Sequence, residues 1–292
     1  MNSKFKGTGV AVITPFHKDG SIDFNSFSKI IEYLIKGKVN YLVVLGSTGE
    51  AATISRDEKN AIINFAVEVV NGRVPLVIGI GGNNTAEVVN AVKNTCFDGV
   101  DAVLSVSPCY NKPPQKGLYI HYRNISNECP VPVIIYNVPG RTSSNISVET
   151  TLKLANDFPN IIGIKDASGD LEQTMKIIQH RPKNFLVISG DDALTLPLMA
   201  LGADGVISVV GNAFPKEFSQ FVNHCMNGDF KKACTIHYKL VDIIDSLFVE
   251  GNPAGIKAAM EIRGLCTGNL RLPLLPISKN TFNHLSQLIQ EF

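Results

Sequence analysis

The chain has 292 residues, of which 45% are hydrophobic, which is enough to bury a large core. Its 27 lysines and arginines nearly balance 26 acidic residues, for a formal net charge of +1, and the basic residues are scattered along the chain. A surface for nucleic acid or for an anionic membrane is therefore not expected, because both require concentrated positive charge.

The N-terminal segment MNSKFKGTGVAVITPF contains an apolar run that is too short for the core of a signal peptide, and no segment has the length of a membrane span. No C-x-x-C pair occurs among the six cysteines, which are Cys96, Cys109, Cys129, Cys225, Cys234 and Cys266. Most of them fall in segments with a helical pattern, which suits buried free thiols in a reducing compartment. We therefore expect a cytoplasmic protein with unpaired cysteines.

Eight short runs rich in Val, Ile and Gly recur along the chain and predict strands. They begin at Gly7, Tyr41, Pro75, Ala102, Val131, Ile161, Phe185 and Gly205. These runs are continuously apolar instead of alternating with polar residues, which is typical of a parallel sheet that is covered on both faces.

Segments with helical spacing of apolar residues separate the strands. Residues 24–37 carry one apolar stripe, formed by Phe24, Phe27, Ile30, Ile31, Leu34 and Ile35, and residues 56–72 end on a glycine stop. After Asn212 only helical patterns follow, in residues 216–228, 231–249, 252–266 and 281–292. We expect the first of these four helices to close the sheet and the others to form an appendage.

Eight strand–helix units in about 220 residues match a (β/α)8 TIM barrel in size and number. We predict a barrel in residues 1–228 and a C-terminal helical domain in residues 229–292. The competing architecture is a doubly wound open sheet, which normally has G-x-G-x-x-G after its first strand. That turn reads ITPFHKDGS here. The glycine-rich GIGGNN follows the third strand instead, where it binds an anion or serves a tight turn.

Lys165 ends the apolar run in IIGIKDASGD, residues 161–170. A lysine at the rim of a protein normally extends into water. In a TIM barrel, however, catalytic groups lie at the carboxyl ends of the strands, and alternation through Ile161 and Gly163 predicts that Lys165 points inward. Apolar walls disfavour the ammonium form of a lysine and leave a neutral amine that attacks a carbonyl, which is how a Schiff base begins.

Other predicted strand ends supply complementary groups. Ser47 and Thr48 offer hydroxyls, Tyr136 a phenol that can relay protons, and Arg141 a guanidinium that can bind a carboxylate. Each residue also has an ordinary structural interpretation: Tyr136 as a core aromatic residue, and the two hydroxyls as helix caps. The spacing between Tyr136, Arg141 and the lysine strand favours a site.

A metal site is not expected. The pair Asp191–Asp192 follows the seventh strand and has ligands suited to a divalent cation. The other strand ends offer mainly hydroxyls, a phenol and an amine, so we interpret both aspartates as turn-forming residues. None of the six histidines falls at a predicted strand end, which argues against zinc or an imidazole base. The sequence predicts no metal and no organic cofactor.

Several motifs resemble those of the dihydrodipicolinate synthase family, a branch of the pyruvate-dependent class I aldolases and lyases. They are GSTGEAATIS, SPCYNKPPQKGLYIHY, IIYNVPGRT, IIGIKDASGD, ISGDD, NPAGIKAAMEIRG and LRLPLLPI, and the resemblance runs from Gly7 to about Ile277. The GSTGE and lysine motifs are specific for the superfamily. The resemblance implies condensation of pyruvate with L-aspartate 4-semialdehyde to 4-hydroxy-tetrahydrodipicolinate, the first committed step of diaminopimelate and lysine biosynthesis.

The resemblance also implies which residues act in catalysis. Lys165 corresponds to the lysine that forms the Schiff base with pyruvate. Tyr136 and Ser47 correspond to the proton relay, with Ser47 at a position where many members have threonine. Tyr110 matches a relay tyrosine that the family donates across a subunit interface; without the family match it would be interpreted as a loop residue that packs on proline. An active dimer within a homotetramer, a dimer of dimers, is implied.

Three further positions match substrate-binding positions of the family. Thr48 corresponds to the group that holds the pyruvate carboxylate, and Arg141 to the arginine that binds the carboxylate of the semialdehyde. Ile207 lies where a backbone carbonyl of the eighth strand faces the site.

Two alternatives stay open. N-acetylneuraminate lyase and 2-keto-3-deoxy sugar acid aldolases resemble this chain in the same lysine and tyrosine, but they generally lack an arginine after the YNxP segment. A catalytically silent homologue that binds or regulates is the alternative of another class. The intact set of Lys165, Tyr136 and Ser47 argues against it.

Feedback inhibition by free lysine is expected to be weak or absent. In lysine-sensitive relatives the effector binds at positions that correspond here to Ala51, Ala52, Arg56, Lys59, Asn83, Glu87 and Cys109. Cys109 stands where such relatives have a tyrosine that packs on the ligand. Arg56 and Lys59 place two fixed cations beside a dicationic ligand, each repulsive by an amount on the order of 1 kcal/mol.

Overall fold

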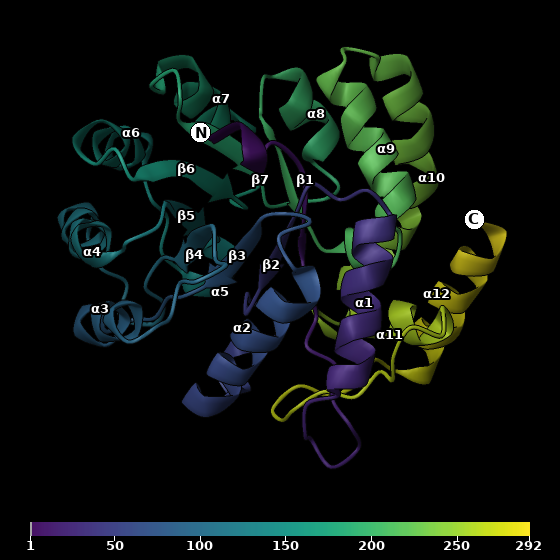
Figure 1. The fold of residues 1–292 in the computed structure, drawn as a ribbon. Helices are drawn as coiled ribbons and strands as arrows, with labels where there is room; N and C mark the ends of the chain where they lie inside the picture. The colour runs from purple at the N-terminus through teal and green to yellow at the C-terminus, as the bar shows by residue number, and fades with distance from the viewer. Residues whose placement is uncertain (1) are drawn as a thin grey trace.

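Eight parallel strands close on themselves in the computed structural model, which describes residues 2–292 (Figure 1). Each strand pairs with the next along the chain, and the last pairs with the first, so the sheet has no open edge. The predicted TIM barrel and its eight strands are confirmed. The strands are β1 (Gly7–Ala11), β2 (Tyr41–Val44), β3 (Leu76–Gly79), β4 (Ala102–Val106), β5 (Val133–Asn137), β6 (Ile161–Asp166), β7 (Leu186–Ser189) and β8 (Gly205–Ser208).

Helices surround the barrel, and four of them follow β8. The helices are α1 (Phe24–Lys36), α2 (Arg56–Val70), α3 (Thr85–Lys93), α4 (Gln115–Glu128), α5 (Pro139–Thr142), α6 (Val148–Asp157), α7 (Leu171–His180), α8 (Thr195–Ala200), α9 (Pro215–Met226), α10 (Phe230–Phe248), α11 (Ala254–Ile262) and α12 (Lys279–Glu291). Three short 3-10 helices are η1 (Asn2–Phe5), η2 (Ala51–Thr53) and η3 (Val210–Asn212). Among residues 2–292, no helix combines the length and the apolar character needed to cross a membrane.

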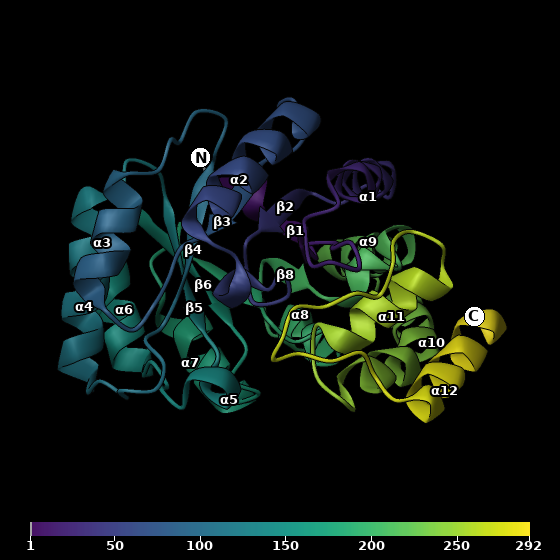
Figure 2. The same ribbon diagram turned by 90° about the horizontal axis from the view of Figure 1, so that it is seen from below.

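The last four helices gather on one side of the barrel, next to α1 (Figure 2). Helix α9 packs against β1 and β8, whereas α11 and α12 pack against α10. The four predicted C-terminal helices are therefore confirmed. The division into a barrel domain of residues 1–228 and a helical domain of residues 229–292 remains our proposal.

Helix α2 begins and ends through side-chain and backbone caps that its sequence carries. The Ser55 side chain accepts a hydrogen bond from the Glu58 backbone, and the Glu58 side chain accepts one from the Ser55 backbone, which is a capping box. The helix ends at Val70, and Asn71 takes the left-handed cap position with φ 46°. The predicted glycine stop at Gly72 is therefore one residue late, because asparagine also adopts this conformation readily.

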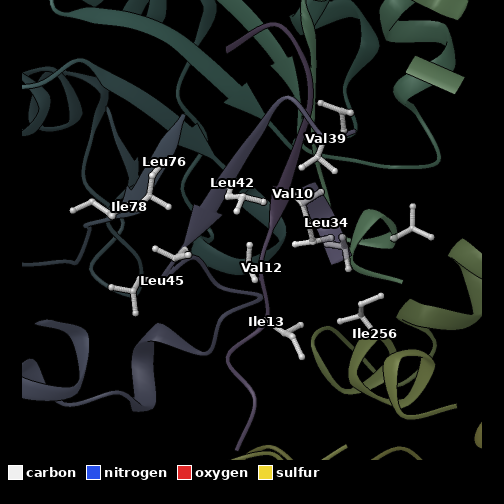
Figure 3. Packing of buried hydrophobic residues seen from close by; sticks show 14 of the residues in the cluster. Val10, Val12, Ile13, Leu34, Val39, Leu42, Leu45, Leu76, Ile78 and Ile256 are labelled. Carbon is white, nitrogen blue, oxygen red and sulfur yellow. The ribbon is translucent and has the colours of Figure 1, made fainter. Parts of the chain in front are cut away.

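Buried apolar side chains form two clusters, one between the strands and the helices and one inside the barrel. Val10 and Leu42 belong to the outer cluster, and their neighbours Ala11 and Val43 to the inner one, as expected from alternation along a strand. Figure 3 shows the outer cluster, in which Ile256 of α11 lies among side chains from β1 and α1. The C-terminal helices thus share one core with the barrel.

Alternation fails at the start of β6. The register between β5 and β6 shifts, so that Val133 pairs with Ile161 and Ile134 pairs with Gly163. Ile161 belongs to the outer cluster and Ile162 to the inner one. The prediction that Ile161 points inward is therefore wrong, because an irregularity of one residue reverses the alternation.

The cysteines are less buried than the sequence suggests. All six are free thiols, but only Cys129 and Cys225 are buried, while Cys96 and Cys109 are exposed. Only Cys225 and Cys234 lie within helices, in α9 and α10. The expectation that most lie in helices is wrong, because the other four fall in the turns and loops beyond the helix ends.

The glycines at the end of β3 and just after it allow close approach of neighbouring backbone. A Cβ atom on Gly79 would lie 2.1 Å from the carbonyl oxygen of Leu45. A Cβ atom on Gly81 would lie 2.9 Å from the backbone nitrogen of Val106. These contacts favour the tight-turn interpretation of GIGGNN over an anion site.

Glycine also permits the closure of the barrel, where β1 meets β8. Gly7 pairs with Gly205, and a Cβ atom on Gly205 would lie 2.1 Å from the carbonyl oxygen of Gly7. Beyond the strands, the Asn212 side chain accepts a hydrogen bond from the Ile13 backbone and donates one to the Ala11 carbonyl. Backbone contact and a buried amide therefore close the barrel together.

Gly205→Ala should destabilise the protein strongly, because the added methyl group overlaps backbone that cannot move without separating β1 from β8. We expect a loss of about 3 kcal/mol or more in the free energy of unfolding, measured by denaturant titration. Gly140→Ala is the matched control, because a Cβ atom there meets nothing within 4 Å. Equal stability of the two variants would contradict this account of closure.

Candidate active site

A cavity of about 550 Å³ opens at the carboxyl ends of the strands. Its walls come from the loops after β2, β5, β6, β7 and β8, and from the end of α10 with the loop that follows. Five of the predicted site residues line it together, namely Ser47, Thr48, Tyr136, Arg141 and Lys165. Residues almost 120 positions apart in the chain therefore converge, because parallel strands place all their carboxyl ends at one rim.

Lys165 lies at the base of this cavity, near the end of β6. It is 4% exposed, and its Nζ atom lies 4.3 Å from the centre of the Tyr136 ring. The two residues are register partners on β5 and β6, so they point to the same side of the sheet. Within residues 2–292, the amine has no ion pair and no hydrogen bond. A buried and unpaired amine beside a phenol is suited to attack on a carbonyl.

Gly190 makes room for the lysine. A Cβ atom at this position would lie 3.0 Å from Cε of Lys165 and 2.6 Å from Cβ of Ala167. All three residues line the cavity. Any side chain at position 190 would therefore displace the amine.

The strand end that carries the lysine is anchored by its neighbour, Asp166. This buried carboxylate accepts hydrogen bonds from the Asn137 amide at 3.0 Å and from the Thr174 hydroxyl at 2.8 Å. These partners belong to β5 and α7, so the end of β6 is held from both sides. Sequence reasoning missed Asp166, although its position directly after the lysine was visible.

Asn252, in the loop between α10 and α11, joins the two ends of the cavity. Its side-chain amide donates to Oγ1 of Thr48 at 2.9 Å, and its backbone carbonyl accepts from the Arg141 guanidinium at 3.0 Å. Thr48 is buried, whereas Arg141 is exposed at the cavity mouth. Asn252 was also missed, although it opens the motif NPAG that carries part of the resemblance.

Two predicted residues do not line the cavity. Tyr110 lies in the loop between β4 and α4, is 89% exposed and has a left-handed backbone with φ 69°. Ile207 on β8 is fully buried in the inner cluster below the cavity. The assigned roles of both residues, as a donor to a partner subunit and as a carbonyl that faces the substrate, stay predictions.

Asp191 and Asp192 both hold turns. Asp191 lines the cavity and accepts a hydrogen bond from the Leu194 backbone, near the start of α8. Asp192 is buried and accepts from the backbone nitrogens of Val209 and Val210, at 2.9 and 2.8 Å. The Asp191 bond gives that residue the turn-forming role expected from the sequence, whereas Asp192 holds backbone after β8, 17 and 18 residues further along the chain. No three His, Cys, Asp or Glu side chains of residues 2–292 group as metal ligands would.

Comparison with known proteins gives the family. A sequence model of the dihydrodipicolinate synthetase family matches residues 4–292. This chain belongs to that family. It is 52% identical over 281 residues to the 4-hydroxy-tetrahydrodipicolinate synthase of Flavobacterium psychrophilum, a match that covers 96% of each chain.

Solved structures of dihydrodipicolinate synthases have the same fold as this chain. The crystal structure of dihydrodipicolinate synthase from Aquifex aeolicus superposes with a TM-score of 0.95 at 40% identity and covers 98% of each chain. A structure described as the first monomeric dihydrodipicolinate synthase variant superposes with a TM-score of 0.97 at 38% identity, over 99% of this chain and 97% of the other. Strong likeness in fold thus extends to a variant that is monomeric.

The seven positions that correspond to the lysine-effector site of sensitive relatives lie in the loops after β2, β3 and β4 and in the first turns of the helices that follow. Cys109, Arg56 and Asn83 are exposed, and Lys59 is partly exposed. Glu87 accepts a hydrogen bond from the Asn84 side chain at 3.0 Å. The Glu87 side chain, one of the polar groups on this surface, is therefore already hydrogen-bonded within the chain.

Asp192 should make the stability of the protein depend on pH. Burial raises the pKa of this carboxyl from 3.8 to about 6, against the opposing effect of the Val210 amide. A raised pKa in the folded state gives a stabilising contribution that is complete below pH 3.8 and is lost as the pH rises through about 6. Relative to Asp192→Asn, the wild-type protein should lose about 3 kcal/mol between acidic and neutral pH.

Denaturant unfolding of both proteins at several pH values measures this difference, because titrations shared by the two proteins cancel. A difference that stays constant from about pH 4 to pH 7 would show that the carboxyl titrates normally.

Proposed function

We propose that this protein condenses pyruvate with L-aspartate 4-semialdehyde to form 4-hydroxy-tetrahydrodipicolinate, as a Schiff-base-forming lyase of diaminopimelate and lysine biosynthesis. The observation that carries the proposal is the buried and unpaired Lys165 beside Tyr136 in the cavity. The relative named 4-hydroxy-tetrahydrodipicolinate synthase, which is 52% identical, supports it.

Of the two fully or nearly buried lysines, Lys165 is the better nucleophile. Lys257 forms an ion pair with Glu50 and donates to the carbonyl oxygen of Asn269 at 2.8 Å, so its nitrogen is occupied by partners within the chain. It also does not line the cavity, whereas Lys165 does. Only the amine of Lys165 is therefore placed to meet a substrate.

The first half of the reaction forms an enamine. The Lys165 amine attacks the ketone carbon of pyruvate, and loss of water leaves an iminium. Tyr136, whose ring lies 4.3 Å from Nζ, and the Ser47 hydroxyl move the protons in this step. Removal of a methyl proton then gives the enamine. We propose that Tyr110 of a partner subunit completes the relay.

The second half joins the two substrates. The enamine carbon attacks the aldehyde carbon, and the aldehyde oxygen takes up a proton. The amine of the semialdehyde then attacks the iminium carbon, closes the ring and frees Lys165. Thr48 holds the pyruvate carboxylate, Arg141 the carboxylate of the semialdehyde, and the Ile207 carbonyl faces the reacting centre.

Arg141 separates this function from that of related aldolases. Its guanidinium lies at the mouth of the cavity, held by the Asn252 carbonyl, where it would meet a carboxylate on the second substrate. N-acetylneuraminate lyase and 2-keto-3-deoxy sugar acid aldolases must recognise a polyol instead. A silent binding protein would have no need of the unpaired amine of Lys165.

We also propose a homotetramer, a dimer of dimers, in which Tyr110 enters the site of the neighbouring subunit. The side chain is 89% exposed in the structure of residues 2–292, which leaves it free to contact a neighbouring subunit and supports the proposal. A cytoplasmic location accords with the biosynthetic role.

Treatment with pyruvate and borohydride should attach one reduced pyruvyl group per chain. Peptide mass mapping should find it on Lys165, because this amine is accessible from the cavity and free of a carboxylate. Lys165→Ala should abolish the adduct, whereas Lys176→Ala, which removes an exposed lysine on α7, should not. An adduct on another lysine would refute the assignment.

Arg141→Ala should separate the two half-reactions. The pyruvate adduct should form nearly as before, while condensation with aspartate semialdehyde falls roughly 10- to 100-fold, the loss expected for charge-assisted hydrogen bonds to the second substrate. Equal loss of both steps would indicate a structural role for the arginine. Faster cleavage of N-acetylneuraminate than condensation by the wild type would assign the protein to the related lyases.

Free lysine should inhibit condensation weakly or not at all. The aromatic wall expected in sensitive relatives is replaced by Cys109, and Arg56 and Lys59 repel the two ammonium groups of free lysine. Condensation rates with and without millimolar lysine test the prediction. Strong inhibition that saturates with lysine concentration would show that these side chains do not oppose binding.

A further inference from the structure

The C-terminal helices reach the turn that carries Ser47 and Thr48 through a buried ion pair. Lys257 on α11 pairs with Glu50 of this turn, and neither side chain has exposed surface. The free-energy cost of removing two charges from water is about as large as the gain from their mutual attraction. A buried ion pair is therefore weak evidence for added stability. Its position next to the cavity indicates another role.

Both charges have further partners. The Lys257 amine donates to the Asn269 carbonyl at 2.8 Å and lies 4.2 Å from the centre of the Phe16 ring. The Glu50 carboxylate accepts from the Arg271 backbone at 3.1 Å. The pair therefore joins the turn to α11 and to the chain after it, with little freedom for either side chain.

The turn itself depends on outside support. Glu50 has a left-handed backbone with φ 55°, which is uncommon for residues other than glycine. Its backbone nitrogen donates to the carbonyl of Ser47 at 3.1 Å, so the two residues are ends of one turn. The Thr14 hydroxyl donates to the carbonyl of Gly49 at 2.7 Å. Strained backbone of this kind persists only where neighbouring contacts hold it.

We propose that Lys257 and Glu50 are positioning residues, whose ion pair sets the place of the Ser47 and Thr48 hydroxyls at the pyruvate end of the cavity. Asn252, five residues before Lys257, bonds Thr48 directly, so the same segment of chain holds the turn at two points. The C-terminal helices thus complete the site from outside the barrel. This inference rests on the proposed function, because it assigns those hydroxyls to pyruvate.

The test compares Lys257→Met, Glu50→Gln and the double variant in the rate of borohydride-trapped adduct formation at limiting pyruvate. All three should be slower by roughly 10- to 100-fold, the effect of small displacements in a catalytic group. Lys257→Met leaves a buried carboxylate without its partner and should lower the melting temperature. The double variant removes both charges and should regain stability while it stays slow.

Leu285→Ala is the control for stability alone. Leu285 is fully buried on α12, and its truncation should lower the melting temperature without a change in the adduct rate. If Lys257→Met does not fold, Glu50→Gln, which keeps the shape of the side chain, decides the question. A folded variant of the pair with the wild-type adduct rate would overturn the inference. Absence of an adduct in the wild type would refute the proposed function instead.

Discussion

An amine can act as a nucleophile inside this barrel only if it is buried without a carboxylate at its side. The fold buries two lysines, one with an ion-pair partner and one without. Lys257 pairs with Glu50 and holds the chain together, whereas Lys165 lines the cavity beside the Tyr136 ring and has no ion pair within residues 2–292. Because a paired carboxylate would favour the charged form of the amine, the lack of an ion pair on Lys165 among residues 2–292 suits its attack on a carbonyl.

The barrel satisfies this constraint through strand geometry and a small number of close contacts. Alternation along β5 and β6 turns Tyr136 and Lys165 to the same side, and the inner cluster below them is apolar. Gly190 leaves the space that the lysine side chain fills. The outer wall comes from α10 and from Asn252, so the C-terminal helices are part of the site and share the core of the barrel.

The sequence predicts the parts of the structure that depend on local pattern. The continuous apolar runs identify all eight strands, and the apolar stripe of residues 24–37 identifies α1. Ile161 was assigned to the wrong face, because a register shift depends on the pairing of two strands and leaves no mark in one of them.

The site was predicted where residues lie at or just beyond the carboxyl ends of strands, as Lys165, Tyr136 and Ser47 do. The contact of Asn252 with Thr48 spans 204 residues, and only the folded chain brings them together.

The most direct test of the unpaired amine is exchange of the pyruvate methyl hydrogens in D2O without a second substrate, followed by proton NMR. Wild-type protein should catalyse exchange and Lys165→Ala should not, because exchange requires the enamine. Equal exchange by both proteins would contradict the account.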